Sequence, residues 1–419
     1  MLDRTSPPPF QHSTSFDLLT PETHTLGNGV DVILVRGGDQ EAVKIELIFH
    51  SGRINETAKG IAYFAGTQLT KGTARHTSYQ INSTFDFYGI HIEVAAGFDY
   101  TFITLYGMTR HIPAVLDLLI DILTNASYPQ HELQQSIAIY QQNLKVNLER
   151  TSYLASRSFR QLVFGVNHPY GYDLEETHLK GITSDALLAF RKEYLRDFAA
   201  VISGRVTDEL AASLFRALGQ IPYHRNQVKG FQLHTPAKLQ EHVEKEDAVQ
   251  TSIRIGKMTI GRSHEDYAGF LLLNHLLGGF FGSRLMKNIR EEKGLTYGIH
   301  SSIQTFRQAT YFVIGADVNR ENRQLTIDEV KREMQRLCDT PVGQEELEIA
   351  RNHFIGSLQT EMNTPFAHAD KHKVLYLYNL QADYFQQLID RMLEANPRGL
   401  QELANNYFSV EDLFVVSAG

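Results

Sequence analysis

The sequence is short of cysteine, of long apolar runs and of basic charge, and each shortage excludes a class of protein. Its single cysteine, Cys338, excludes an intrachain disulfide and a zinc site built from several thiolates. No apolar run approaches the length of a membrane span, and the N-terminus has no apolar core of a signal peptide. A formal net charge of −8 argues against a nucleic-acid-binding protein, which normally presents a basic face.

The composition is otherwise that of a globular protein. With 419 residues, 42% of them hydrophobic, the chain is long enough for two domains of about 200 residues, each with its own core. One cysteine fits a reducing compartment. We therefore expect a cytoplasmic protein with no membrane or nucleic-acid partner, and a periplasmic location as the alternative if a leader peptide has been removed.

The chain divides into four predicted parts. Three consecutive prolines and a polar stretch indicate an extended arm over residues 1–20. A polar segment containing Pro236 predicts an interdomain linker over residues 224–240. The N-terminal half is then residues 21–223 and the C-terminal half is residues 241–419. Both mix strand and helix patterns, which predicts an α+β fold.

The two halves resemble copies of one unit. A four-residue match alone can arise by chance, but three matches in the same order at a nearly constant offset favour a duplication. The matches are residues 88–91 with 297–300 (297 − 88 = 209), 132–133 with 346–347 (346 − 132 = 214), and Tyr194 with Tyr407 (407 − 194 = 213). Each half is predicted to form an antiparallel-rich sheet covered on one face by helices.

The order of elements and several motifs resemble the pitrilysin/insulinase superfamily of zinc metallopeptidases, in particular its short type similar to the mitochondrial processing peptidase. The most specific match is the block from Arg290 to Tyr297, and the resemblance covers nearly the whole chain after the arm. Weaker matches are residues 26–30, 71–73, 167–171, 277–279 and 283–285. The resemblance implies two duplicated α/β halves that form half of a clamshell, and a pair of such chains that closes around a peptide.

The zinc ligands of that superfamily are absent. Active members carry H-x-x-E-H on the helix before K-G-T, where two His bind zinc and the Glu activates water, with a further Glu ligand about 76 residues later. Here Tyr63 replaces the first His, Gly66 the base and Thr67 the second His, and 67 + 76 = 143 places Asn143 at the last ligand. We expect no metal or other cofactor in this chain, which should bind no stoichiometric zinc and cleave no peptide by itself.

A second set of residues matches the superfamily. Its active members use an Arg and a Tyr, seven residues apart in the second half, which reach the substrate at the metal; Arg290 and Tyr297 match this pattern. The chemistry suits the residue types, because arginine is always charged and can orient a carbonyl, while a tyrosine hydroxyl can donate to a developing oxyanion. Two structural alternatives stay open: Arg290 as a solvated helix residue, and Tyr297 as a core residue at the start of a strand.

Two other features are interpreted as structural. His368 and His372 lie four residues apart, so a helix would place both imidazoles on one side. The surrounding residues are highly polar and no third ligand is evident, which favours a solvated face. Residues 277–282 lack the Lys-Ser/Thr of a phosphate-binding loop, which favours a turn between helices.

The resemblance implies a non-zinc subunit of a heterodimeric metallopeptidase. The partner would be a homologous chain that holds zinc, and this chain would close the chamber and supply Arg290 and Tyr297. The substrate would be an unfolded peptide, held in part by strand addition to an exposed sheet edge. The alternative is an inert structural or peptide-binding pseudopeptidase that pairs with itself or serves as a scaffold. A third, weaker alternative is unrelated chemistry in the same chamber, for which the sequence shows no constellation.

Overall fold

The computed structural model describes residues 5, 15–227, 229–232, 236 and 238–419. Parts of the predicted arm and linker lie outside the described residues, namely 1–4, 6–14, 228, 233–235 and 237. The strands are β1 (Glu22–Thr25), β2 (Asp31–Arg36), β3 (Ala42–Phe49), β4 (His91–Ala96), β5 (Thr101–Met108), β6 (Phe198–Gly204), β7 (Gln240–Val243), β8 (Gln250–Met258), β9 (Thr296–Thr305), β10 (Thr310–Asn319) and β11 (Phe414–Ala418).

Helices fill the connections between these strands. The α-helices are α1 (Ile61–Thr67), α2 (Ser78–Phe87), α3 (Leu116–Asn125), α4 (Gln130–Leu148), α5 (Thr151–Phe164), α6 (Glu176–Leu179), α7 (Ser184–Tyr194), α8 (Asp208–Gly219), α9 (Tyr267–Asn274), α10 (Arg323–Asp339), α11 (Gln344–Thr360), α12 (Pro365–Leu377), α13 (Tyr384–Glu394) and α14 (Pro397–Tyr407). Two π-helical segments follow in the second half, η4 (His275–Gly279) and η5 (Met286–Glu292). The turn predicted over residues 277–282 begins inside η4, where Gly278 has non-helical backbone angles, and continues between the two segments.

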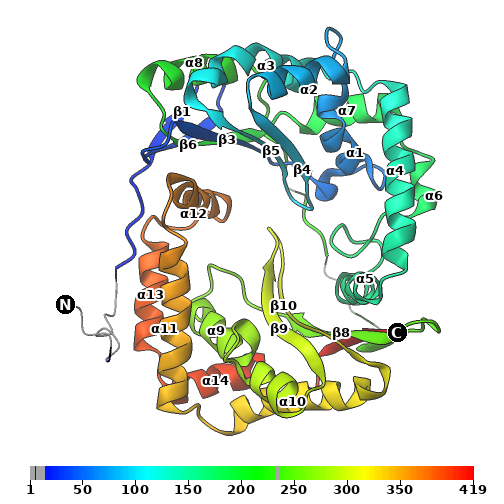
Figure 1. Ribbon diagram of the computed structural model, residues 1–419, viewed down its shortest axis with the longest axis vertical. Helices are drawn as coiled ribbons and strands as arrows, with labels where there is room; N and C mark the ends of the chain where they lie inside the picture. The colour runs from blue at the N-terminus through cyan, green and yellow to red at the C-terminus, as the bar shows by residue number, and fades with distance from the viewer. Residues whose placement is uncertain (1–4, 6–14, 228, 233–235, 237) are drawn as a thin grey trace.

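The strands form two sheets that share one five-strand order, to which β1 adds a sixth strand in the first sheet; this confirms the predicted α+β fold of two duplicated halves (Figure 1). The first sheet has the order β1-β2-β6-β3-β5-β4 and the second has the order β7-β11-β8-β10-β9. Within each sheet one pair is parallel, β2 with β6 and β7 with β11, and the other pairs are antiparallel. The repeated Tyr-Gly-Ile-His tetrapeptide leads into β4 in one half and lies in β9 in the other, both of them edge strands.

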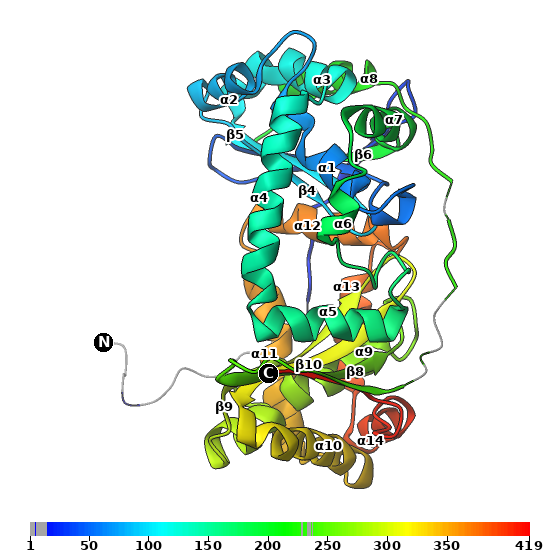
Figure 2. The same cartoon turned by 90° about the vertical axis from the view of Figure 1, so that its right-hand side faces the viewer.

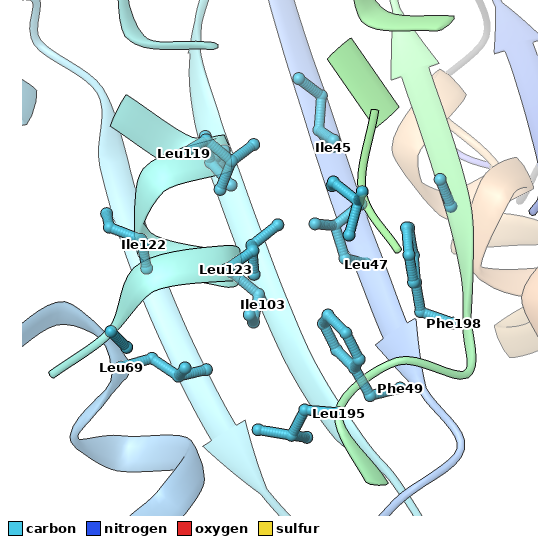
Figure 3. Packing of buried hydrophobic residues seen from close by; sticks show 14 of the residues in the cluster. Ile45, Leu47, Phe49, Leu69, Ile103, Leu119, Ile122, Leu123, Leu195 and Phe198 are labelled. Carbon is cyan, nitrogen blue, oxygen red and sulfur yellow. The ribbon is translucent and has the colours of Figure 1, made fainter. Parts of the chain in front are cut away.

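Each sheet buries one face under helices of its own half. In the first half, Ile45, Leu47 and Phe49 of β3 point to the same face of the sheet and are buried in one core with Leu119 and Leu123 of α3, and the Phe49 ring lies beside Phe198 (Figure 3). The second half repeats this arrangement with a separate apolar core under α9, α10 and α14. These two cores are the main source of hydrophobic stabilisation.

The opposite face of each sheet is covered by a helix from the other half. Helix α5 comes from the N-terminal half but packs on β8 and β11, and its Phe159 lies against Tyr311 of β10 and Phe414 of β11. Helix α12 comes from the C-terminal half but packs on β2 and β6 of the first sheet. Figures 1 and 2 show both helices between the two halves. The division along the chain at residues 224–240 is therefore not the division in space.

The described part of the N-terminal arm lies on the second half. Phe16 is buried among side chains of α11, α12 and α13, and its N–H donates to the Gln386 side chain at 2.8 Å. His368 and His372 bind both polar groups of Leu19, whose N–H donates to His368 Nδ1 at 3.2 Å and whose carbonyl oxygen lies 2.8 Å from His372 Nε2.

The prediction that His368 and His372 form a solvated face is therefore wrong for His372. This residue is only 9% exposed, and burial lowers its pKa. The polar residues around the two histidines suggested exposure, but the side of α12 that carries them is covered by the arm, which is distant in the sequence. Across the described ranges, no helix is both long and apolar enough to cross a bilayer.

Candidate functional site

The positions that the predicted alignment assigns to the zinc ligands and the base lie on α1 and α4 of the first half. Tyr63 is half-buried, and its ring lies 5.4 Å from the ring of Tyr140 on α4. The Thr67 hydroxyl donates to the carbonyl oxygen of Tyr63 at 2.9 Å, the usual bond of a threonine to the preceding helical turn. Asn143 is exposed on α4. The residue that faces Tyr63 across the two helices is thus Tyr140, one turn before the position that counting along the sequence selected.

These residues do not fit a zinc ion. Burial raises the pKa of Tyr63 and raises that of Tyr140 to about 12, so both phenols are protonated at pH 7 and are poor metal ligands. Gly66 offers no base, and a Cβ at this position would lie only 3.0 Å from the Ala96 Cβ on β4. The close approach of α1 to the sheet leaves little room there for a glutamate. These positions therefore do not provide a site for a catalytic zinc ion.

Arg290 and Tyr297 lie together at the surface of the second half. The guanidinium of Arg290 is 5.2 Å from the ring centre of Tyr297 and 4.7 Å from that of Phe281, so it contacts two aromatic rings. Tyr297 is 91% exposed and Phe281 is 61% exposed. The alternative reading of Tyr297 as a core residue is wrong, and Arg290 is partly covered by aromatic rings rather than fully solvated.

The backbone between the two residues explains their approach. Arg290 lies in the last turn of η5, which ends at Glu292, and Gly294, two residues further on, is in the left-handed region with φ +62°. The chain then enters β9, whose pairing with β10 is shifted by an irregularity opposite residues 316–318. Tyr297 lies at this bulge, and a bulge turns the side chain of an edge strand out of the regular alternation. A helix end followed by a bulge brings the two side chains to one surface.

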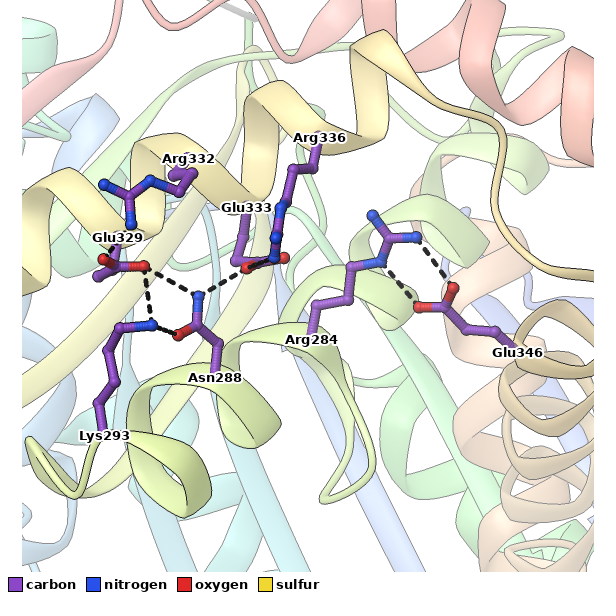
Figure 4. A network of polar contacts seen from close by, with 8 residues as sticks. All are labelled: Arg284, Asn288, Lys293, Glu329, Arg332, Glu333, Arg336 and Glu346. Atoms are coloured by element: carbon purple, nitrogen blue, oxygen red, sulfur yellow. Dashed lines mark hydrogen bonds and ion pairs between the residues drawn. The ribbon is translucent and has the colours of Figure 1, made fainter.

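A buried polar network holds η5 against α10 (Figure 4). The Asn288 side-chain amide donates to Glu329 at 3.1 Å and to Glu333 at 2.6 Å, and Lys293 lies 3.2 Å from Glu329. Glu329 and Glu333 are almost completely buried, and Arg336 also pairs with Glu333 at 2.8 Å. Although burial opposes ionisation, these partners hold the pKa of Glu329 below its usual value. The helix that carries Arg290 is thus fixed by charged hydrogen bonds.

A second ion pair fixes the start of this region. Arg284 donates from Nε and from an Nη to the two carboxylate oxygens of Glu346 on α11, at 2.7 Å and 2.9 Å. The hydrogen bonds from Arg284 lower the pKa of Glu346, against the opposing effect of burial. Two parallel bonds of this kind orient both side chains and are stronger than bonds between neutral groups.

This pair predicts a pH-dependent stability. We expect Glu346→Gln to lower the free energy of unfolding at pH 7 by about 1.5–3 kcal/mol, because hydrogen bonds to a charged group are lost. Since the folded-state pKa of Glu346 is depressed, the contribution is complete above about pH 4.3 and disappears as the pH falls through the lower folded value. Urea unfolding of both proteins should show a difference that narrows below about pH 4.

A matched control for this experiment lies on the same helix. Glu348 is exposed and, within the described part of the chain, accepts a hydrogen bond only from the Gln344 side chain. Glu348→Gln should change stability by no more than about 0.5 kcal/mol at either pH. An equal effect of the two substitutions, or a Glu346→Gln effect independent of pH, would contradict the prediction.

The structure defines an α+β protein of two duplicated halves, and the side chains at the predicted zinc positions do not fit a zinc ion. Two sequence models of one family match it, "Insulinase (Peptidase family M16)" over residues 31–164 and "Peptidase M16 inactive domain" over residues 181–354. The chain belongs to the M16 peptidase family, the family that its motifs resemble.

Similar proteins share this architecture over almost their whole length. "Uncharacterized zinc protease YmxG" of Bacillus subtilis is 23% identical over 92% of this chain and 95% of its own length. "Non-peptidase homolog YmxG" of Helicobacter pylori is 22% identical over 94% of this chain and 89% of its own. The crystal structure of a peptidase M16 inactive domain from Pseudomonas fluorescens superposes with a TM-score of 0.88 at 23% identity, covering 96% and 98% of the two chains. At 23% identity, this structural similarity shows a shared fold and not a shared activity.

Proposed function

We propose that this chain is the non-zinc subunit of a heterodimeric M16 metallopeptidase. It closes the peptide chamber of a homologous zinc-bearing chain and supplies Arg290 and Tyr297 to that partner's zinc site. Zinc, general base and attacking water come from the partner. Arg290 orients the peptide carbonyl, and the Tyr297 hydroxyl donates to the oxyanion that forms on it.

The observation that carries this proposal is the Arg290–Tyr297 pair at the surface. Tyr297 is 91% exposed and contributes little to the fold, and Arg290 is half-buried against aromatic rings. The backbone positions of both are nevertheless set by a left-handed glycine, a bulge and a buried network. The phenol group of Tyr297 makes no hydrogen bond with the described residues, so its donor is free for a ligand. Stabilisation of a transition state requires polar groups that are held in position by a fixed backbone and are free to bind the substrate.

Two of the relatives' names agree with loss of activity in this chain, an inactive domain and a non-peptidase homolog, whereas YmxG of Bacillus subtilis is named a zinc protease. Peptide binding is supported by the sheets. Strands β4 and β9 lie at sheet edges, where backbone N–H and C=O groups can pair with an extended peptide. Tyr297 stands near the beginning of β9, so a peptide along this edge would pass the pair.

The experiment that tests the proposal compares three preparations. We expect this chain alone to cleave no unfolded peptide, because the predicted motif positions hold no zinc ligand. We expect the mixture with a related H-x-x-E-H chain from the same genome to cleave it. The partner alone should be inactive or much slower. Cleavage of a fluorogenic unfolded peptide and the mass of the complex in solution are the measurements.

The competing function is that of an inert pseudopeptidase, favoured by the complete loss of the metal positions. The same experiment distinguishes the two functions. The chain would form a homodimer or a complex whose cleavage rate equals that of the partner alone. Activity of this chain by itself would contradict both functions.

A further inference from the structure

The second half contains its own copy of the helix pair that carries the lost zinc positions. The duplication relates η4 to α1 and α11 to α4, and His275 corresponds to Tyr63 at an offset of 212 (275 − 63). The glycines confirm this register. A Cβ on Gly66 would meet the edge strand β4, and a Cβ on its counterpart Gly278 would lie 2.9 Å from the Cβ of Ser301 on the edge strand β9.

The partner of His275 is also at the corresponding position. His353 on α11 lies 213 residues after Tyr140 (353 − 140), the residue that faces Tyr63 in the first half. The two rings lie 5.1 Å apart, close to the 5.4 Å between the two tyrosines. Where the first half has two phenols, the second half has two imidazoles.

The imidazoles face each other through nitrogen atoms. His275 Nε2 lies 3.1 Å from His353 Nδ1. The ring of Phe280 stacks on His275 at 4.7 Å with an interplanar angle of 12° and also contacts His353 at 4.9 Å, so both rings are held in place. His275 is buried, whereas His353 is exposed and lines an open cavity of about 530 Å³ along α11.

This spacing suits a shared metal ion. Two nitrogens that each lie about 2.0–2.1 Å from one tetrahedral ion are about 3.3 Å apart. One of the facing nitrogens of His275 and His353 now carries a proton, which can move to the other nitrogen of its ring when an ion takes its place. Among the described residues no group of three His, Cys, Asp or Glu could hold a metal, so water from the cavity would complete the coordination.

We propose that His275 and His353 form a two-imidazole site for a divalent transition-metal ion in the second half of this chain. Imidazole nitrogens select first-row ions, and the natural order of affinity predicts the tightest binding for copper(II), with nickel(II) and zinc(II) weaker. The site is separate from the zinc expected in a partner subunit. It does not depend on the proposed peptidase role. The expectation that this chain binds no zinc then holds only for the predicted zinc positions in the first half.

The test is a titration of the full chain with copper(II), nickel(II) and zinc(II). The chain has 18 histidines, so the informative quantity is the difference between variants. We expect His353→Asn to remove one bound ion per chain, or to weaken its binding at least tenfold, with an unchanged melting temperature because His353 is exposed. Electron paramagnetic resonance of the copper complex should show two imidazole nitrogens in the wild type, and this signal should disappear in the variant.

The matched control is His131→Asn on α4, whose side chain is 80% exposed and has no second histidine facing it. It should leave the ion count and the copper spectrum unchanged. An ion count unaffected by His353→Asn, or reduced equally by His131→Asn, would overturn the proposal and leave a hydrogen-bonded histidine pair only.

Discussion

Tyr297→Phe in the assembled heterodimer is expected to lower turnover by roughly 10²–10³ while the complex forms normally, because a single oxyanion donor contributes about this much in acyl-transfer enzymes. The substitution removes one hydroxyl from a side chain that is 91% exposed, so the fold of the free chain should not change. The Michaelis constant should change little, since the donor acts mainly in the transition state. Steady-state kinetics of the reconstituted enzyme, with melting temperature and complex mass, measure the effect.

Arg290→Ala should have a similar effect on turnover and a larger effect on substrate affinity, because an arginine that holds the peptide carbonyl acts in the ground state as well. Its removal also leaves the rings of Phe281 and Tyr297 without the cation between them. The matched control for Tyr297→Phe is Tyr79→Phe on α2, since this tyrosine is 80% exposed and no arginine lies against its ring among the described residues. Unchanged turnover in both Arg290→Ala and Tyr297→Phe would reduce this chain to a scaffold.

Lys373→Met is expected to lower the free energy of unfolding by about 3–5 kcal/mol, the cost of leaving a buried charge without its partner. Lys373 lies on α12, and its Nζ is 2.7 Å from the carboxylate of Glu46 on β3 of the other half; the two side chains are 18% and 9% exposed. Burial opposes the charge of Lys373, but Glu46 and Asp370 raise its pKa above the usual value. Without the lysine, the Glu46 carboxylate has no ion-pair partner among the described residues at the contact between α12 and the first sheet.

Two variants separate this cause from a general effect of changing α12. Lys371→Met on the same helix removes a pair with the exposed Glu361 and should cost at most about 1 kcal/mol. The double variant Lys373→Met/Glu46→Leu should recover most of the lost stability, because an apolar pair needs no compensating charge. Urea unfolding measures all three, and equal losses in the two single variants would contradict the prediction.

Much of the architecture could be predicted from local sequence. The alternation from Val43 to Phe49 is β3, and the repeated Tyr-Gly-Ile-His tetrapeptide marks equivalent edge strands in two sheets that share one five-strand order. These features are visible because strand period and turn residues depend on neighbours in the chain. The same holds for the spacing of Arg290 and Tyr297, although their role in catalysis stays a prediction.

Other features depend on residues that are far apart in the sequence. The exchange of α5 and α12 between the halves has no local signal, since each helix has an ordinary helical pattern and only packing selects its sheet. Counting along the chain selected Asn143, but the side of α4 that faces Tyr63 carries Tyr140. His372 was misread because the arm that covers it comes from the other end of the chain.

The sequence by itself determined which chemistry is lost from this protein, because the identity of a ligand is a local property: phenol, glycine, hydroxyl and amide cannot replace imidazoles and carboxylates at the zinc positions. The tertiary structure decided which side chains meet. Arg290 and Tyr297 share a surface through a bulge and a helix end, and His275 and His353, 78 residues apart, face each other at 3.1 Å. Such contacts arise from the packing of helices and sheets, which no single segment encodes.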